Sequence, residues 1–165
     1  MSQNNLERMI KLADEFFATK NDPSQISVDE KVMARLREIH PNSMNEKATE
    51  DGPVAWAIVL PTTRELMGKF IGKKITEKEL LDRTPPGEKY DAIYFCSVLV
   101  LPEYRGKGYA KKLVMESVRS ICKDHSIECF FYWGFSAEGE RLARCIAEEF
   151  HLPLFQRGSD PEISS

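Results

Sequence analysis

The stretch that most constrains the fold is an apolar run near the middle of the chain, DAIYFCSVLVL, which covers residues 91–101. Its β-branched and aromatic residues favour a strand, and its nearly continuous hydrophobicity indicates burial on both faces. A strand that is covered on both faces lies inside a sheet. The sequence therefore predicts a central strand here, with helices packed on either side.

The elements after this strand set the topology. Apolar residues keep helical spacing from Ala110 to about Lys123, a second buried strand covers residues 127–135, and an amphipathic helix covers residues 136–149. A strand, helix, strand order implies a right-handed crossover, which pairs the two strands in parallel. We therefore expect an α/β fold built on a sheet that is at least partly parallel.

Apolar spacing and capping signals predict the elements of the first half. Ser27-Val-Asp-Glu30 and Thr76-Glu-Lys-Glu79 both have the form of a capping box. The predicted elements are a helix over 4–19, a helix from Ser27 to about His40, a polar loop over 42–52, a strand over 54–62, a short helix or turn over 64–72 and a helix from Thr76 that ends before Pro85. The chain length suits one domain over residues 1–165, with residues 158–165 as a frayed tail.

Charge and composition exclude some partners. The 23 basic and 26 acidic residues give a net charge of -3, so no global positive field exists to hold nucleic acid or an anionic membrane. No apolar run approaches the roughly 20 residues that a membrane-spanning helix needs. The four cysteines form no CxxC pair and the three histidines stand far from them, which argues against a zinc site. We expect a cytoplasmic protein with reduced thiols and no metal.

The turn after the central strand is a predicted anion site. The first backbone N–H groups of a helix lack partners within the helix, and its dipole adds about half a positive charge there. Gly106 and Gly108 have no Cβ to block an approaching phosphate, and both can take positive φ. Positive potential is added by Arg105, Lys107, Lys111 and Lys112. A phosphate or pyrophosphate is the predicted ligand.

Two familiar phosphate loops do not match this turn. The GxxxxGK[ST] loop is absent, because Lys107 lies between the two glycines and neither Ser nor Thr follows. The GxGxxG loop fails because Lys111 stands where its third glycine belongs. Neither a P-loop NTPase nor a dinucleotide fold is indicated.

The turn resembles the acyl-CoA loop of the GNAT superfamily of N-acyltransferases, whose pattern is [QR]-x-x-G-x-[GA]. Residues 105–110, RGKGYA, fit it at every fixed position, and residues 98–104, VLVLPEY, resemble the approach V-x-P-x-[YF]. The resemblance is firm over about residues 91–150. It implies a mixed, twisted sheet flanked by helices that splays open between the strand at 91–101 and the strand at 127–135.

The resemblance also implies a set of cofactor-binding residues for acetyl-CoA. The strand segment at Val98, Leu99 and Val100 would pair with the pantetheine arm, and the N–H of Val98 would polarise the thioester carbonyl. Ser136 stands where the family often has an asparagine, although its place at a helix start also suits an N-cap. The backbone N–H groups that would cradle the pyrophosphate are those of Arg105, Gly106, Lys107, Gly108, Tyr109 and Ala110.

The general acid of the family is missing at its usual place. The family often supplies it from a tyrosine about seven residues past the asparagine, and here that position is Ala143. Tyr132 and Tyr94 on the flanking strands are the nearest substitutes, with Cys96 or Asp91 assisting through water. Each of these four also has a structural interpretation, as a core residue or as the start of a strand.

The sequence leaves the acceptor open. Trp56, Phe70 and Trp133 are candidates for lining its pocket, although aromatic residues at such positions also fill cores. Our first hypothesis is an N-acetyltransferase that moves an acetyl group from acetyl-CoA to a primary amine by direct attack. The alternatives are a non-catalytic acyl-CoA-binding or regulatory module and a phosphate-binding interaction domain outside this family. The oligomeric state stays open, a homodimer included.

Overall fold

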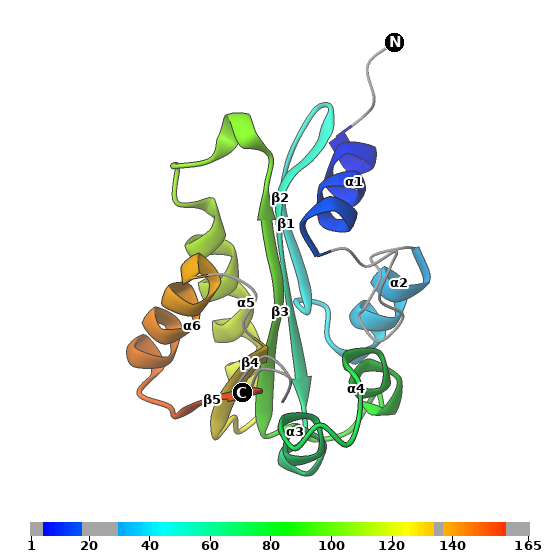
Figure 1. Ribbon diagram of the computed structural model, residues 1–165, viewed down its shortest axis with the longest axis vertical. Helices are drawn as coiled ribbons and strands as arrows, with labels where there is room; N and C mark the ends of the chain where they lie inside the picture. Colours follow the sequence, from blue (N-terminus) through cyan, green and yellow to red (C-terminus); the bar gives the residue numbers. More distant parts are fainter. Residues whose placement is uncertain (1–4, 18–29, 134–136, 158–165) are drawn as a thin grey trace, which may run out of the picture.

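The computed structural model of the chain describes residues 5–17, 30–133 and 137–157 (Figure 1). The capping box that begins at Ser27, the residue Ser136 and the tail at 158–165 lie outside these residues. The elements in chain order are α1 (Asn5–Phe17), α2 (Glu30–Ile39), β1 (Met44–Thr49), β2 (Gly52–Thr62), α3 (Arg64–Ile71), α4 (Glu77–Arg83), β3 (Ala92–Val100), the 3-10 helix η2 (Pro102–Tyr104), α5 (Tyr109–Asp124), β4 (Cys129–Trp133), α6 (Ala137–Phe150) and β5 (Leu154–Arg157).

The strands form one mixed sheet in the order β1-β2-β3-β4-β5. The strands β1, β2 and β3 pair antiparallel, whereas β3, β4 and β5 pair in parallel. The central place of β3 and its parallel pairing with β4 confirm two predictions from the sequence. The parallel pairing follows from the crossover through α5, and the central place follows because β3 also pairs with β2 on its other side.

Helices cover the two faces of the sheet, as Figure 1 shows. Helices α5 and α6 lie on one face, and α1, α2 and α4 lie on the other. The alternation of side chains along each strand divides the core accordingly, with Ile93 and Phe130 facing α5 and α6, and Tyr94 and Phe131 packed in the opposite cluster. All four are fully buried, which explains why β3 and β4 read as continuous apolar runs.

Two strands were not predicted. The stretch 42–52, predicted as a polar loop, contains β1, which pairs with β2. That prediction was wrong because β1 is an edge strand with four exposed residues in succession, so its sequence lacks the apolar alternation that marks a strand. The second, β5, has only four residues and two of them are exposed. Edge strands of this kind are held in the sheet by main-chain hydrogen bonds to the neighbouring strand, and much less by buried side chains.

The segment between β2 and β3 folds into two short helices. The predicted capping box of α4 is confirmed: Thr76 Oγ1 accepts from the Glu79 N–H at 3.1 Å, and the Glu79 carboxylate accepts from the Thr76 N–H at 3.1 Å. Thr63 caps α3 with a single side-chain bond, in which its Oγ1 accepts from the Leu66 N–H at 3.2 Å. These caps satisfy backbone N–H groups at the starts of α3 and α4, whose buried residues pack in the same core cluster as those of α2.

Candidate functional site

The central sheet splits part of the way along β3. Parallel pairing joins Ala92–Phe95 of β3 to Cys129–Tyr132 of β4 and then stops, while β3 continues to Val100. Within the described residues, positions 96–100 have no partner on β4. A bulge accompanies the split, because Ile58 pairs with Ser97 whereas the next residue, Val59, pairs with Phe95. Cys96 is thus the extra residue, and a bulge bends and twists its strand at that point.

The backbone of β3 presents polar groups to this split. The Leu101 N–H donates to the Val54 carbonyl of β2 at 2.8 Å. Peptide groups alternate in direction along a strand, so those of Val98 and Val100 point the other way, toward the split. The contact of Arg105 agrees with this direction, because its Nε donates to the Val100 carbonyl at 3.2 Å. The split therefore exposes a strand edge able to pair with an extended ligand.

The glycine turn lies between this edge and the start of α5. Gly106 and Gly108 have φ of 81° and 78°, in the left-handed region that favours glycine. Gly108 is the N-cap of α5 and makes no side-chain capping bond. A Cβ placed on either glycine would meet no atom within 4 Å, so the space in front of the turn is open. The N–H groups of the first turn of α5 face an accessible region, as an anion site requires.

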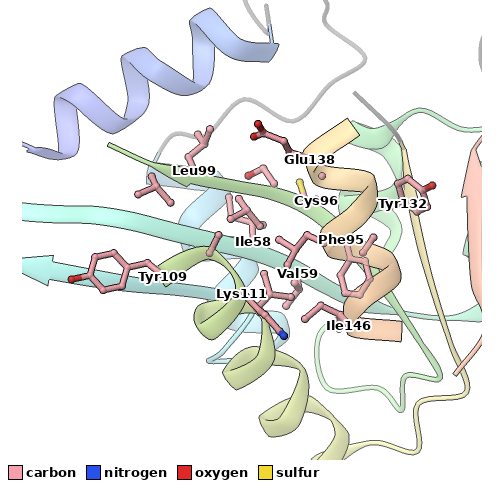
Figure 2. A pocket seen from close by; sticks show the side chains of 18 of the residues that line it. Ile58, Val59, Phe95, Cys96, Leu99, Tyr109, Lys111, Tyr132, Glu138 and Ile146 are labelled. Atoms are coloured by element: carbon pink, nitrogen blue, oxygen red, sulfur yellow. The ribbon is translucent and has the colours of Figure 1, made fainter. Parts of the chain in front are cut away.

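A cavity of about 820 Å³ joins the turn to the split. Figure 2 shows Tyr109 of α5 at one end of it and Tyr132 of β4 at the other. Its wall includes residues from both faces of β3: Phe95 and Val98, which pack toward α5 and α6, and Cys96, which packs against the opposite cluster. Its volume lies within the roughly 300–1,000 Å³ typical of small-molecule sites.

Three tyrosines line this cavity: Tyr104 and Tyr109 beside the glycine turn, and Tyr132 on β4. Tyr132 is the one on the strand that flanks the split. Burial raises the pKa of its hydroxyl, and the nearby Glu140 carboxylate raises the pKa further while Arg144 opposes it. Glu140 and Arg144 lie on α6 on either side of Ala143, which also lines the cavity. The hydroxyl from β4 therefore lies beside the part of α6 where the sequence has no tyrosine. It stays protonated at neutral pH, so it can act as a proton donor.

Tyr94 and Cys96 project toward the opposite face. Tyr94 is fully buried and its hydroxyl donates to the Glu77 carboxylate. Burial, followed by the charge of Glu77, raises the pKa of Tyr94 well above its usual value. Cys96 lines the cavity, and burial followed by the charge of Glu77 raises the pKa of its thiol well above its usual value. Asp91 accepts from the Arg64 N–H at 2.7 Å and so holds the start of α3.

The three candidate aromatic residues for the acceptor pocket separate in the structure. Trp56 and Phe70 are fully buried in the core, whereas Trp133 lines the cavity. The guanidinium of Arg157 lies 4.5 Å from the Phe70 ring centre and 4.6 Å from that of Trp133. It also donates to the Ile75 carbonyl at 3.0 Å. Of these three residues, Trp133 lines the cavity, and Arg157 packs against its ring.

Sequence reasoning missed Ser97, which lines the cavity, and two polar residues that contact neighbouring side chains: Glu77, which accepts from Tyr94, and Arg157, which packs on Trp133. Glu77 reads as an ordinary first-turn helix acid, and Arg157 as a surface residue near the end of the chain. The Ser97 hydroxyl is buried without a hydrogen-bond partner in the described part of the chain. No spacing in the sequence links these residues, because the inserted helices α3 and α4 bring Glu77 to the sheet.

The described residues contain no cluster of three or more His, Cys, Asp or Glu side chains arranged to hold a metal ion. In the same part of the chain, every helix is too short or too polar to cross a membrane.

Comparison with protein families gives one match. The family model described as the acetyltransferase (GNAT) family matches residues 11–149. Comparisons with curated proteins and with solved structures found no match. The matched range contains the glycine turn, both strands of the split and nearly all of α6.

Proposed function

Because this chain belongs to the GNAT acetyltransferase family, we propose that it is an N-acetyltransferase that moves an acetyl group from acetyl-CoA to a primary amine by direct attack. The observation that carries the proposal is the free edge of β3 at residues 96–100, which lies in the wall of a cavity that begins at the glycine turn. An extended pantetheine arm has amides spaced to pair with such an edge.

The residues at the turn fit acetyl-CoA. The open space before Gly106 and Gly108 leaves room for phosphate oxygens against the backbone N–H groups of residues 105–110. The Val98 and Val100 peptide groups then lie along the arm, with Leu99 between them, and the Val98 N–H polarises the thioester carbonyl. Arg105 exchanges its bond to the Val100 carbonyl for the pyrophosphate when the arm pairs with that carbonyl.

Tyr132 is the proposed proton donor to the departing thiolate. Tyr132 lines the cavity, and its hydroxyl interacts with Glu140 and Arg144 of α6. The hydroxyl carries its proton at neutral pH, because burial raises a pKa that already lies well above neutrality. Tyr94 is less suited because its hydroxyl is already bonded to Glu77. Cys96 remains a neutral thiol because its pKa is raised. In this proposal Tyr132 of β4 takes the role that the family often gives to a tyrosine on the helix, where this chain has Ala143.

A non-catalytic acyl-CoA-binding module is the second candidate. Ala143 favours it, since the position that often carries the family's acid here bears a methyl group. The acetyltransferase and the non-catalytic module would bind acetyl-CoA at the same site, and only the acetyltransferase would transfer the acetyl group. A module of this kind binds acetyl-CoA and releases no CoA.

Release of free CoA tests the proposal. The protein is incubated with acetyl-CoA and each of a panel of amines, polyamines and peptide N-termini, and the free thiol is measured with a chromogenic disulfide. We expect amine-dependent release for at least one acceptor. Binding of acetyl-CoA without release for any acceptor would support the non-catalytic module, and equal affinity for inorganic pyrophosphate and CoA would support a simple phosphate-binding domain.

A further inference from the structure

The bulge in β3 turns two consecutive side chains to the same face of the sheet. Cys96 is the extra residue of the bulge, and Ser97 is the next residue that pairs with β2, opposite Ile58. Ile58 belongs to the core cluster on the face opposite α5 and α6, and residues paired across antiparallel strands share a face. Cys96 packs against the same cluster. Bulges next to active sites often re-aim a side chain in this way.

The Ser97 hydroxyl is an unpaired polar group in the wall of the cavity. Its oxygen is buried and has no hydrogen-bond partner within the described residues. Other buried atoms without a partner in that part of the chain belong to Ser43, Trp56, Ser117 and Arg157, and these residues do not line the cavity. An unpaired buried hydroxyl is costly, and native proteins keep few of them. No bond holds the hydroxyl in its present rotamer, so a turn about χ1 toward the split breaks none.

The two faces of the split offer different chemistry to a bound thioester. An arm that pairs with the free edge of β3 has its carbonyl groups close to the plane of the sheet, and an attacking atom approaches a carbonyl carbon from above or below that plane. The side of α5 and α6 has Phe95 and Val98, together with Tyr132. The other side has Cys96 and Ser97. Figure 2 shows Phe95 and Cys96 on either side of β3.

We propose that Ser97 binds the attacking amine of the acceptor on the face opposite α5 and α6. Its oxygen accepts a hydrogen bond from the amine N–H and so directs the nitrogen at the thioester carbonyl carbon. Tyr132 then serves the departing thiolate from the other face. The inference rests on the proposed acetyltransferase function, and it adds the residue that orients the acceptor and the face from which the acceptor enters.

The hydroxyl of Ser97 suits this role better than the thiol beside it. A neutral primary amine has two N–H groups and one lone pair, so donating one N–H to the serine oxygen leaves the lone pair free for the carbonyl carbon. A hydroxyl oxygen accepts such a bond well, whereas the sulfur of Cys96 is a weak acceptor. One hydrogen bond of this kind favours the bound amine by about two- to tenfold over a group that lacks the N–H.

Two stable thioethers of CoA test the contact without a known acceptor. One has N-ethylacetamide on the sulfur, and its amide N–H stands for that of the attacking amine. The other has ethyl acetate, in which an oxygen replaces the N–H. Calorimetry measures the Kd of both for wild type, Ser97→Ala and the control Ser117→Ala. Ser117 is a matched control because its hydroxyl is also buried without a partner in the described residues, and it lies on α5 outside the cavity wall.

We expect wild type and Ser117→Ala to bind the amide about two- to tenfold more tightly than the ester, and Ser97→Ala to bind the two equally. Both alanine variants should be at least as stable as wild type without ligand, because each loses an unpaired buried hydroxyl. If Ser97→Ala does not fold, Ser97→Cys gives the same comparison, since it keeps the shape of the side chain and replaces the oxygen by a weak acceptor.

The two proposals fail in different ways. If both thioethers bind but wild type does not prefer the amide, or if Ser97→Ala keeps the preference, the role of Ser97 is overturned and the acetyltransferase function stands. If neither thioether binds to wild type, the proposed CoA site is wrong and the proposed function fails first.

Discussion

Replacing Gly108 by alanine separates the cofactor role of the turn from its backbone cost, because the chain contains a matched glycine elsewhere. Gly108 and Gly87 both have φ of 78°, and a Cβ at either position would meet no atom within 4 Å. Gly108 lines the cavity, whereas Gly87 lies in the segment between α4 and β3. Gly87→Ala is therefore the control for Gly108→Ala.

The two substitutions should lower the free energy of unfolding of the ligand-free protein by the same amount. An L-residue in the left-handed region loses about 1–2 kcal/mol, and alanine recovers about 0.4–1 kcal/mol by restricting the unfolded chain. The net loss is about 1 kcal/mol in each variant. For a chain of this length that loss lowers Tm by about 2–4 °C.

Acetyl-CoA should distinguish the variants. At a concentration of 100 Kd the ligand adds about 2.7 kcal/mol to the free energy of unfolding, which raises Tm by about 5–10 °C. A methyl group on Gly108 occupies the space in front of the turn and should weaken binding about tenfold, so the gain falls to about 1.4 kcal/mol. Gly87→Ala should keep the full gain.

Thermal unfolding at one fixed acetyl-CoA concentration measures both quantities. Gly108→Glu extends the series, because a carboxylate at the phosphate position should remove the gain altogether. An equal gain in Tm for wild type and both Gly108 variants would refute the assignment of the turn as the pyrophosphate site, whatever the stability of the free proteins.

Three further predictions concern other parts of the molecule. Tyr132→Phe should lower kcat by about 10²-fold or more in the CoA-release assay without changing the acetyl-CoA gain in Tm; an unchanged kcat would exclude the hydroxyl as the acid. Burial, together with the charge of His40, lowers the pKa of His125 in the folded protein, so the unfolded state binds more protons and stability should fall as pH drops below about 6.5. His125→Gln should flatten that dependence in a pH series of melts, and an unchanged slope would contradict it. Thr76→Ala, which removes the cap of α4, should cost about 1 kcal/mol in denaturant unfolding, whereas a loss near zero would show that packing alone holds the helix.

The parts of the fold that the sequence predicts are those specified by side chains. The buried run of β3, the crossover through α5 and the glycine turn each carry a local pattern, and each is present in the structure. The strands β1 and β5 are held by main-chain pairing at exposed edges, where side chains carry little information. Propensity arguments therefore fail there for a physical reason.

The candidate site divides in the same way. The anion-binding end follows from two glycines and a helix start, which are adjacent in sequence. The contact between Glu77 and Tyr94 has no such local signal, because Glu77 belongs to a separate helix and accepts from the Tyr94 hydroxyl across 17 positions in sequence. The capping box correctly locates the start of α4, but it does not predict which side chain of that helix packs against the sheet. Only the tertiary structure joins the two.

The most direct test of the account is amide hydrogen exchange along β3 with and without acetyl-CoA. The pairing of β3 with β4 ends at Phe95, and the Val98 and Val100 amides face the split. The account predicts that acetyl-CoA slows exchange at residues 105–110 and, within 96–100, at Val98 and Val100, whose amides face the split. Residues 92–95 should be unchanged, because they are already paired with β4. Unchanged exchange at both 96–100 and 105–110 in millimolar acetyl-CoA would contradict it.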